Sequence, residues 1–176
     1  MTNLTQNRIL RVTRWLVCLI MGLVAFAGVV LAAVSVFLPF YWNEVVKELL
    51  TSNPGINATE LMPQLLAIFA LCIVVLGLIW TMMRKLLAII ASVEIGNPFV
   101  LANAVRLKAI GWIMVALQLV GIPLALIAGR TADMFGESDT GLDLSLNGIL
   151  AILLVFILAG IFERGAEMRE ELEGTV

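Results

Sequence analysis

Hydrophobic residues gather in four long runs along the chain, and three polar stretches separate them. The runs cover about residues 15–42, 61–83, 109–129 and 144–162, and none of them contains Asp, Glu, Lys or Arg. An α-helix of about 20 apolar residues crosses a hydrocarbon core of about 30 Å. The pattern therefore predicts an all-α, polytopic membrane protein with four transmembrane helices, forming a single domain over residues 1–176.

The first run follows a basic segment, and this order is also typical of a signal peptide. The apolar core of a signal peptide has about 7–15 residues and ends at a small-residue cleavage site. This run is longer, and it ends in Phe40-Tyr41-Trp42, which suits a membrane interface. The sequence therefore favours a retained transmembrane helix over a cleaved signal peptide.

Two polar stretches are predicted to be outer loops. Asn43–Glu60 contains one or two turns of amphipathic helix suited to a membrane surface, whose apolar side is formed by Val45, Val46, Leu49 and Leu50. Arg130–Asp143 is rich in acids: Asp133, Glu137, Asp139 and Asp143. Its spacing lacks the alternation and closing Glu of a calcium loop, so a solvated acidic loop is the better interpretation.

The third polar stretch, within Ser92–Trp112, combines turn residues with basic residues. Gly96 suits the end of one helix, Asn97 the cap of the next, and Pro98 its first turn. Helical composition continues on both sides of this turn. The sequence therefore predicts a long hairpin of residues 84–108 between the second and third transmembrane helices.

Basic residues are distributed unequally between the two sides of the predicted membrane. Only Lys47 and Arg130 fall on the side of the outer loops, and nine of the 11 fall on the other: Arg8, Arg11, Arg14, Arg84, Lys85, Arg106, Lys108, Arg164 and Arg169. Cytoplasmic loops carry the excess of Lys and Arg. We therefore expect both termini and the hairpin in the cytoplasm, and the chain in the bacterial inner membrane.

Composition agrees with a membrane protein and adds little chemistry. The chain is 61% hydrophobic and 14% charged, with a mean hydropathy of +1.06. Its net charge of −2 gives no reason to expect nucleic-acid binding. Histidine is absent. Cys18 and Cys72 lie at different predicted depths, so no disulfide is expected.

The sequence offers no candidate for catalysis, for a metal or for a cofactor. It has no nucleophile elbow and no phosphate-binding loop, so we expect no enzyme. Ionisable groups that could couple transport are absent from the four runs. Within the third run, Gln118 is suited to a hydrogen bond with a neighbouring helix, and Pro123 is expected to bend the helix. A transporter-like or lipid-contacting protein, or a structural membrane subunit, remains the alternative function.

A stripe of small residues in the first run permits close helix packing: Gly22, Ala25, Gly28 and Ala32. Packing within the chain and a homo-oligomer explain this stripe equally well.

The tail, residues 163–176, continues the fourth helix with a charged sequence. Ile161, Gly165, Met168 and Leu172 recur at helical spacing, so they form either the core of a small cytoplasmic bundle or a docking surface. In the bundle, the acids of the tail would face Arg8, Arg11, Arg106 and Lys108 as exposed pairs. In the docking interpretation, the candidate partner-binding residues are Glu94, Phe99, Asn103, Arg106, Glu163, Glu167, Met168, Glu171 and Leu172.

Two motifs in these segments resemble a known family. The pattern GNPF…NA.RL..IGW, from Gly96 to Trp112, and the ending IFERGAEMREELEGTV, from Ile161, are similar to the bacterial membrane family DUF2975. The resemblance implies four spans with both termini inside, and no assigned activity or cofactor. Genes of this family commonly lie beside a small helix-turn-helix regulator of the Cro type. The resemblance thus implies a membrane partner, or a sequestering antagonist, of a transcription regulator.

Overall fold

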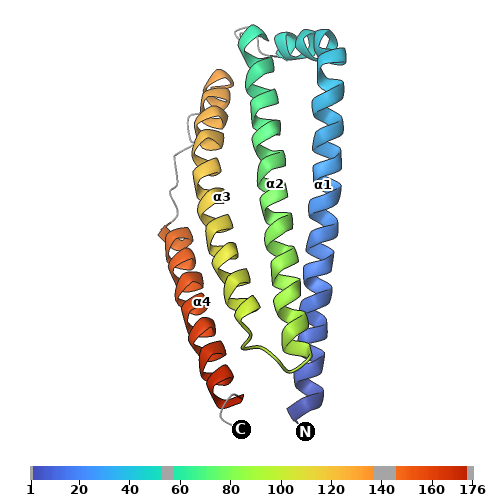
Figure 1. The fold of residues 1–176 in the computed structure, drawn as a ribbon. Helices are drawn as coiled ribbons and strands as arrows, with labels where there is room; N and C mark the ends of the chain where they lie inside the picture. Colours follow the sequence, from blue (N-terminus) through green and yellow to red (C-terminus); the bar gives the residue numbers. More distant parts are fainter. Residues whose placement is uncertain (1, 53–57, 137–145, 174–176) are drawn as a thin grey trace. The chain divides into compact units, whose positions relative to one another are not determined.

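The computed structural model describes residues 2–52, 58–136 and 146–173, which form four long helices (Figure 1). These are α1 (Thr2–Ser52), α2 (Ala58–Glu94), α3 (Leu101–Met134) and α4 (Leu146–Glu173). Each helix contains a segment that is apolar and long enough to cross a membrane. The predicted all-helical fold with four membrane-spanning helices is therefore confirmed.

The helices extend well beyond the apolar runs that identified them. α2 continues past Met83 through a charged segment to Glu94, and α3 begins before its apolar run. α4 likewise continues through the charged tail to Glu173. These extensions are rich in Leu, Ala, Glu, Met and Arg, which favour helix whether or not they face lipid.

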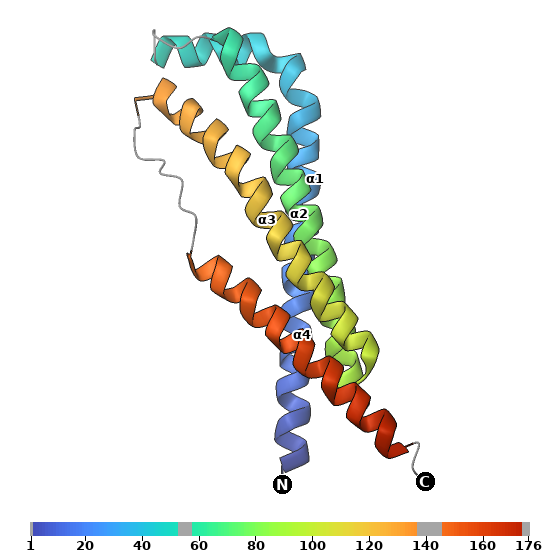
Figure 2. The same ribbon diagram turned by 60° about the vertical axis from the view of Figure 1, so that its left-hand side comes forward.

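The first expected outer loop begins later than Asn43, because α1 remains helical through Ser52. Pro39 lies inside α1 and cannot donate the usual hydrogen bond to the carbonyl of Ser35. Beyond it, the last turns of α1 lie across the direction of the preceding turns (Figures 1 and 2). These turns are amphipathic: Val45, Val46 and Leu49 are half-buried, whereas Glu44, Lys47 and Glu48 are exposed. Leu50, which was predicted on the apolar side, is exposed as well.

The second expected outer loop also begins later than predicted. α3 continues through Arg130 to Met134 and ends in a turn at Gly136, whose φ is +78°. The amide of Gly136 donates to the carbonyl of Asp133 at 3.1 Å. The remaining acids of this stretch, Glu137, Asp139 and Asp143, lie outside the described residues.

Contacts divide the described residues into two compact units. The first unit comprises the described residues of Met1–Val24, Leu78–Ala116 and Ser145–Val176. The second comprises those of Ala25–Gly77 and Leu117–Leu144. The core of the first unit is formed by Ile89, Leu107, Ile110 and Ala159, against which Met82, Met114, Val155 and Phe162 pack.

In the second unit, apolar packing is accompanied by a polar contact between described residues of α2 and α3. The hydroxyl of Thr131 on α3 donates to Oε1 of Gln64 on α2 at 3.1 Å. Gly28 of α1 faces Leu76 of α2, whereas the other members of the small-residue stripe, Gly22, Ala25 and Ala32, are exposed. Packing within the chain therefore accounts for only one position of that stripe.

Candidate interaction site

The connection between α2 and α3 begins with a Schellman turn at Gly96. Gly96 has a φ of +84°, in the left-handed region that favours glycine. Its amide donates to the carbonyl of Val93 at 3.0 Å, and the amide of Asn97 donates to the carbonyl of Ser92 at 3.0 Å. These two bonds satisfy carbonyls that the end of a helix leaves free. The expected role of Gly96 is therefore confirmed.

The start of α3 lies further along the chain than the sequence predicted. Asn97 and Pro98 are not the cap and first turn of this helix, because α3 begins at Leu101. The first bond of the helix is donated by the amide of Asn103 to the carbonyl of Val100, at 2.9 Å. The side chain of Asn97 instead accepts a hydrogen bond from Nη1 of Arg169 on α4, at 2.8 Å.

Asn103 organises the connection from the inside of the first unit. Its exposed fraction is 0%, although it is a polar residue on a helix. Nδ2 of Asn103 donates to the hydroxyl of Ser92 and, at 2.8 Å, to the carbonyl of Pro98. Oδ1 accepts from Nη1 of Arg106 at 2.7 Å, and the same nitrogen lies 3.3 Å from the carbonyl of Ala88. This network ties the end of α2, the connection and the start of α3 together.

α4 packs closely against this connection because it presents small residues there. A Cβ atom at Gly165 would lie 2.8 Å from Cδ1 of Phe99, so only glycine permits the observed approach. The ring of Phe99 also contacts that of Phe162, with centroids 5.2 Å apart. Ala166, the next residue in the chain, is also buried. The two sequence motifs therefore pack against each other.

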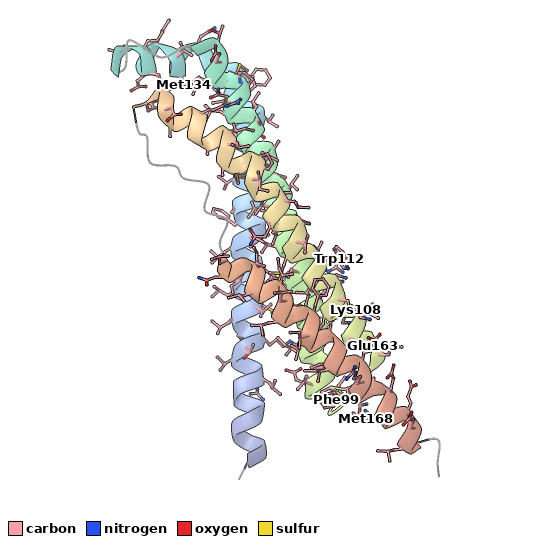
Figure 3. The ribbon with its side chains drawn as sticks, turned by 90° about the vertical axis from the view of Figure 1, so that its left-hand side faces the viewer. Phe99, Lys108, Trp112, Met134, Glu163 and Met168 are labelled. Carbon is pink, nitrogen blue, oxygen red and sulfur yellow. The ribbon has the colours of Figure 1, made fainter. Side chains whose placement is uncertain are left out.

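Ion pairs between described residues join helices of the first unit. Nζ of Lys108 donates to both carboxylate oxygens of Glu163, at 2.7 and 2.9 Å (Figure 3). Nη1 of Arg14 on α1 donates to Oε2 of Glu94 at the end of α2, at 3.2 Å. All four side chains are partly exposed, so each pair contributes about 1 kcal/mol or less. These pairs favour one arrangement of the helices, with α1 beside the end of α2 and α3 beside α4.

One face of the α4 tail exposes large apolar side chains in the described part of the chain. Met168 and Leu172 have exposed fractions of 59% and 74%. The stripe noted in the sequence is therefore divided, because Gly165 packs on Phe99 while Met168 and Leu172 face outward. Glu167 and Glu171 are exposed beside them. We name Glu167, Met168, Glu171 and Leu172 the exposed tail face.

The remaining candidate residues have structural roles in the first unit. Asn103 is buried, Arg106 is held by Asn103, and Phe99 packs on α4. Glu94 and Glu163 are engaged in the ion pairs. Sequence reasoning expected Lys108 among the cations facing the acids, but it did not single out Arg14. The partner of Arg14 depends on a contact between α1 and α2, for which the sequence carries no local signal.

Four long apolar helices with charged ends define a multi-pass membrane protein. The chain belongs to the DUF2975 family, since the family model "Protein of unknown function (DUF2975)" matches residues 51–176, more than half of the chain. The matched range contains both motifs that pack together in the first unit. No curated protein and no solved structure matches the chain.

Proposed function

We propose that this protein is an interaction protein of the bacterial inner membrane, and that its cytoplasmic helix ends bind a small DNA-binding regulator. The observation that carries this proposal is the exposed tail face. Met168 and Leu172 are uncovered on a helix end that lies outside the apolar run, where lipid tails do not cover them. Nearer the apolar run, Phe99 of the connection covers Gly165 of the same helix.

The chemistry of this face suits a basic partner. Glu167 and Glu171 are exposed beside the two apolar side chains, and Glu170 is exposed on a neighbouring side of the helix. A regulator that contacts DNA phosphates is positively charged where it does so. Carboxylates favour such a surface, and Met168 and Leu172 supply the apolar anchors. Covering the DNA-binding surface blocks DNA binding without a conformational change.

The test uses the full chain in detergent and a small helix-turn-helix regulator of the Cro type, the class of partner that is proposed. Wild-type protein should retain this regulator and weaken its binding to operator DNA in a mobility-shift measurement. Met168→Ser/Leu172→Ser removes both anchors from exposed positions, so it should release the regulator and restore DNA binding.

Ile95→Ser is the matched control, because Ile95 is also an exposed apolar residue in the first unit, with an exposed fraction of 78%. It should retain the regulator as the wild type does. Equal retention by the double variant and the wild type would contradict the proposed role of the exposed tail face. Replacing residues 51–58 by a Gly/Ser linker should leave retention unchanged, since this segment is predicted to lie on the other side of the membrane.

A further inference from the structure

A basic pocket of about 330 Å³ lies between α2 and α3 in the first unit. It is lined by Thr81, Arg84, Lys85, Ala88 and Arg106. Three of these five residues are cations, and no carboxylate is among the described residues that line the pocket. Arg14 and Lys108, which form ion pairs with carboxylates in this unit, do not line the pocket. The basic pocket therefore concentrates uncompensated positive charge.

Arg106 is positioned for this pocket by neutral partners. Its Nη1 donates to Oδ1 of Asn103 at 2.7 Å and lies 3.3 Å from the carbonyl of Ala88. Because Asn103 is fully buried and hydrogen-bonded on its other side, its carboxamide is a fixed acceptor. Neutral acceptors orient the guanidinium without cancelling its charge. The remaining N–H groups of Arg106 stay available to an anion.

The position of the pocket along both helices matches the edge of the membrane. The apolar run of α2 ends at Met83, directly before Arg84. The apolar run of α3 begins at Ala109, one helical turn after Arg106. The cations therefore lie where the headgroups of a leaflet meet its hydrocarbon, and Thr81 extends the lining into the apolar run.

From this arrangement we propose that the basic pocket binds the phosphate group of an anionic phospholipid. Arg84, Lys85 and Arg106 supply charge-assisted donors to the phosphate oxygens. The acyl chains of the lipid then lie along the apolar runs below the pocket. A zwitterionic lipid brings its own cation toward three others, so the pocket prefers a lipid with net negative charge.

The experiment is native mass spectrometry of the full chain in detergent, with phosphatidylglycerol and phosphatidylcholine supplied at equal concentrations. Wild-type protein should bind phosphatidylglycerol more tightly. Arg84→Gln/Lys85→Gln should weaken that binding about 25-fold, since each Lys or Arg near the anionic headgroups contributes about fivefold. The charge-preserving variant Arg84→Lys/Lys85→Arg should bind nearly as the wild type does.

The control Arg11→Gln/Arg164→Gln removes two exposed cations of the first unit that do not line the basic pocket. It should leave the preference for phosphatidylglycerol unchanged, and an equal loss in control and test variants would overturn the proposal. Displacement of the lipid by inorganic phosphate at about 1 mM would show a soluble ligand instead of a lipid. The variant Arg84→Gln/Lys85→Gln changes folding if these cations are structural, so a salt series on the wild-type protein provides an independent test. Binding of phosphatidylglycerol should weaken as the NaCl concentration rises, whereas binding of phosphatidylcholine should not. No difference between the lipids in that series would also overturn the proposal.

Discussion

At the scale of single residues, glycines decide how closely the helices of the first unit approach. A Cβ atom at Gly111 of α3 would lie 2.9 Å from Cζ of Phe156 on α4. The ring of Phe156 also meets Trp112 edge-on, with centroids 5.7 Å apart, so it is held from two sides. Gly160, on α4, has open space where its Cβ would be. The two glycines therefore differ in what they contribute to packing.

Gly111→Ala should destabilise the protein, although alanine favours helix more than glycine does by about 1 kcal/mol. The added methyl group must displace the ring of Phe156, and overpacking of this kind costs about 1–3 kcal/mol. Gly160→Ala, which meets no neighbour, should leave the stability unchanged or raise it. Thermal unfolding in detergent measures both variants, and an increase in melting temperature for Gly111→Ala would contradict the packing argument.

Asn103→Ala should lower the stability of the first unit. The substitution removes the acceptor for Arg106 and the donors for Ser92 and Pro98 while these groups remain partly buried. Leaving a buried polar group without its partner costs about 1–3 kcal/mol. Ala102→Ser, at the neighbouring exposed position, is the control and should be tolerated. Equal melting temperatures for the two variants would show that the network contributes little.

At the scale of the elements, the apolar runs and turn residues of the sequence predicted where the helices lie, but they predicted the contacts between helices less well. The absence of charge over each run is sufficient to predict a spanning helix, and Gly96 has the positive φ expected at a helix end. The beginning of α3 was missed because Asn97 bonds to Arg169 of α4, a residue distant in sequence. The burial of Asn103 was missed for a similar reason, since its hydrogen-bond partners come from three segments of the first unit: α2, the connection and α3.

Gly96→Val should shorten or strain the connection between α2 and α3. No atom lies near the added Cβ, so the effect comes from the backbone: a φ of +84° costs a side chain about 1–2 kcal/mol. Asn tolerates this conformation better than other residues with side chains, so Gly96→Asn should be closer to the wild type. The yield and melting temperature of folded protein distinguish the two. A Gly96→Val protein as stable as Gly96→Asn would contradict a backbone origin.

At the scale of the whole chain, the two motifs that indicated the family contact each other in the first unit. Phe99 meets Gly165, and Lys108 meets Glu163, so each motif supplies the partners of the other. This pairing explains why the sequence could predict which segments form the candidate site, but not which of their residues are packed and which are exposed. Periodicity placed Gly165 and Met168 on one stripe, but only the position of Phe99 separates the packed residue from the exposed one.

The orientation of the chain in the membrane rests on the unequal distribution of its basic residues, and cysteine labelling tests it. In a Cys18→Ala/Cys72→Ala background, single cysteines at Glu44 and Asp133 replace exposed residues at the predicted outer ends of α1 and α3. Both should react with a membrane-impermeant thiol reagent in intact cells. A cysteine at Ile95 is equally accessible on the protein but predicted to be cytoplasmic, so it should react only after lysis.

Ile95 is a better reporter than Ser92, because Ser92 accepts a hydrogen bond from Asn103 and its replacement would disturb the connection. Labelling of Ile95→Cys in intact cells, with protection of the cysteines at positions 44 and 133, would reverse the orientation. The exposed tail face and the basic pocket would then lie outside the cytoplasm. In that case a cytoplasmic regulator could not reach Met168 and Leu172, whereas the basic pocket would still meet a lipid headgroup in the opposite leaflet. One labelling experiment thus separates the two proposals, because only the regulator-binding function requires the predicted orientation.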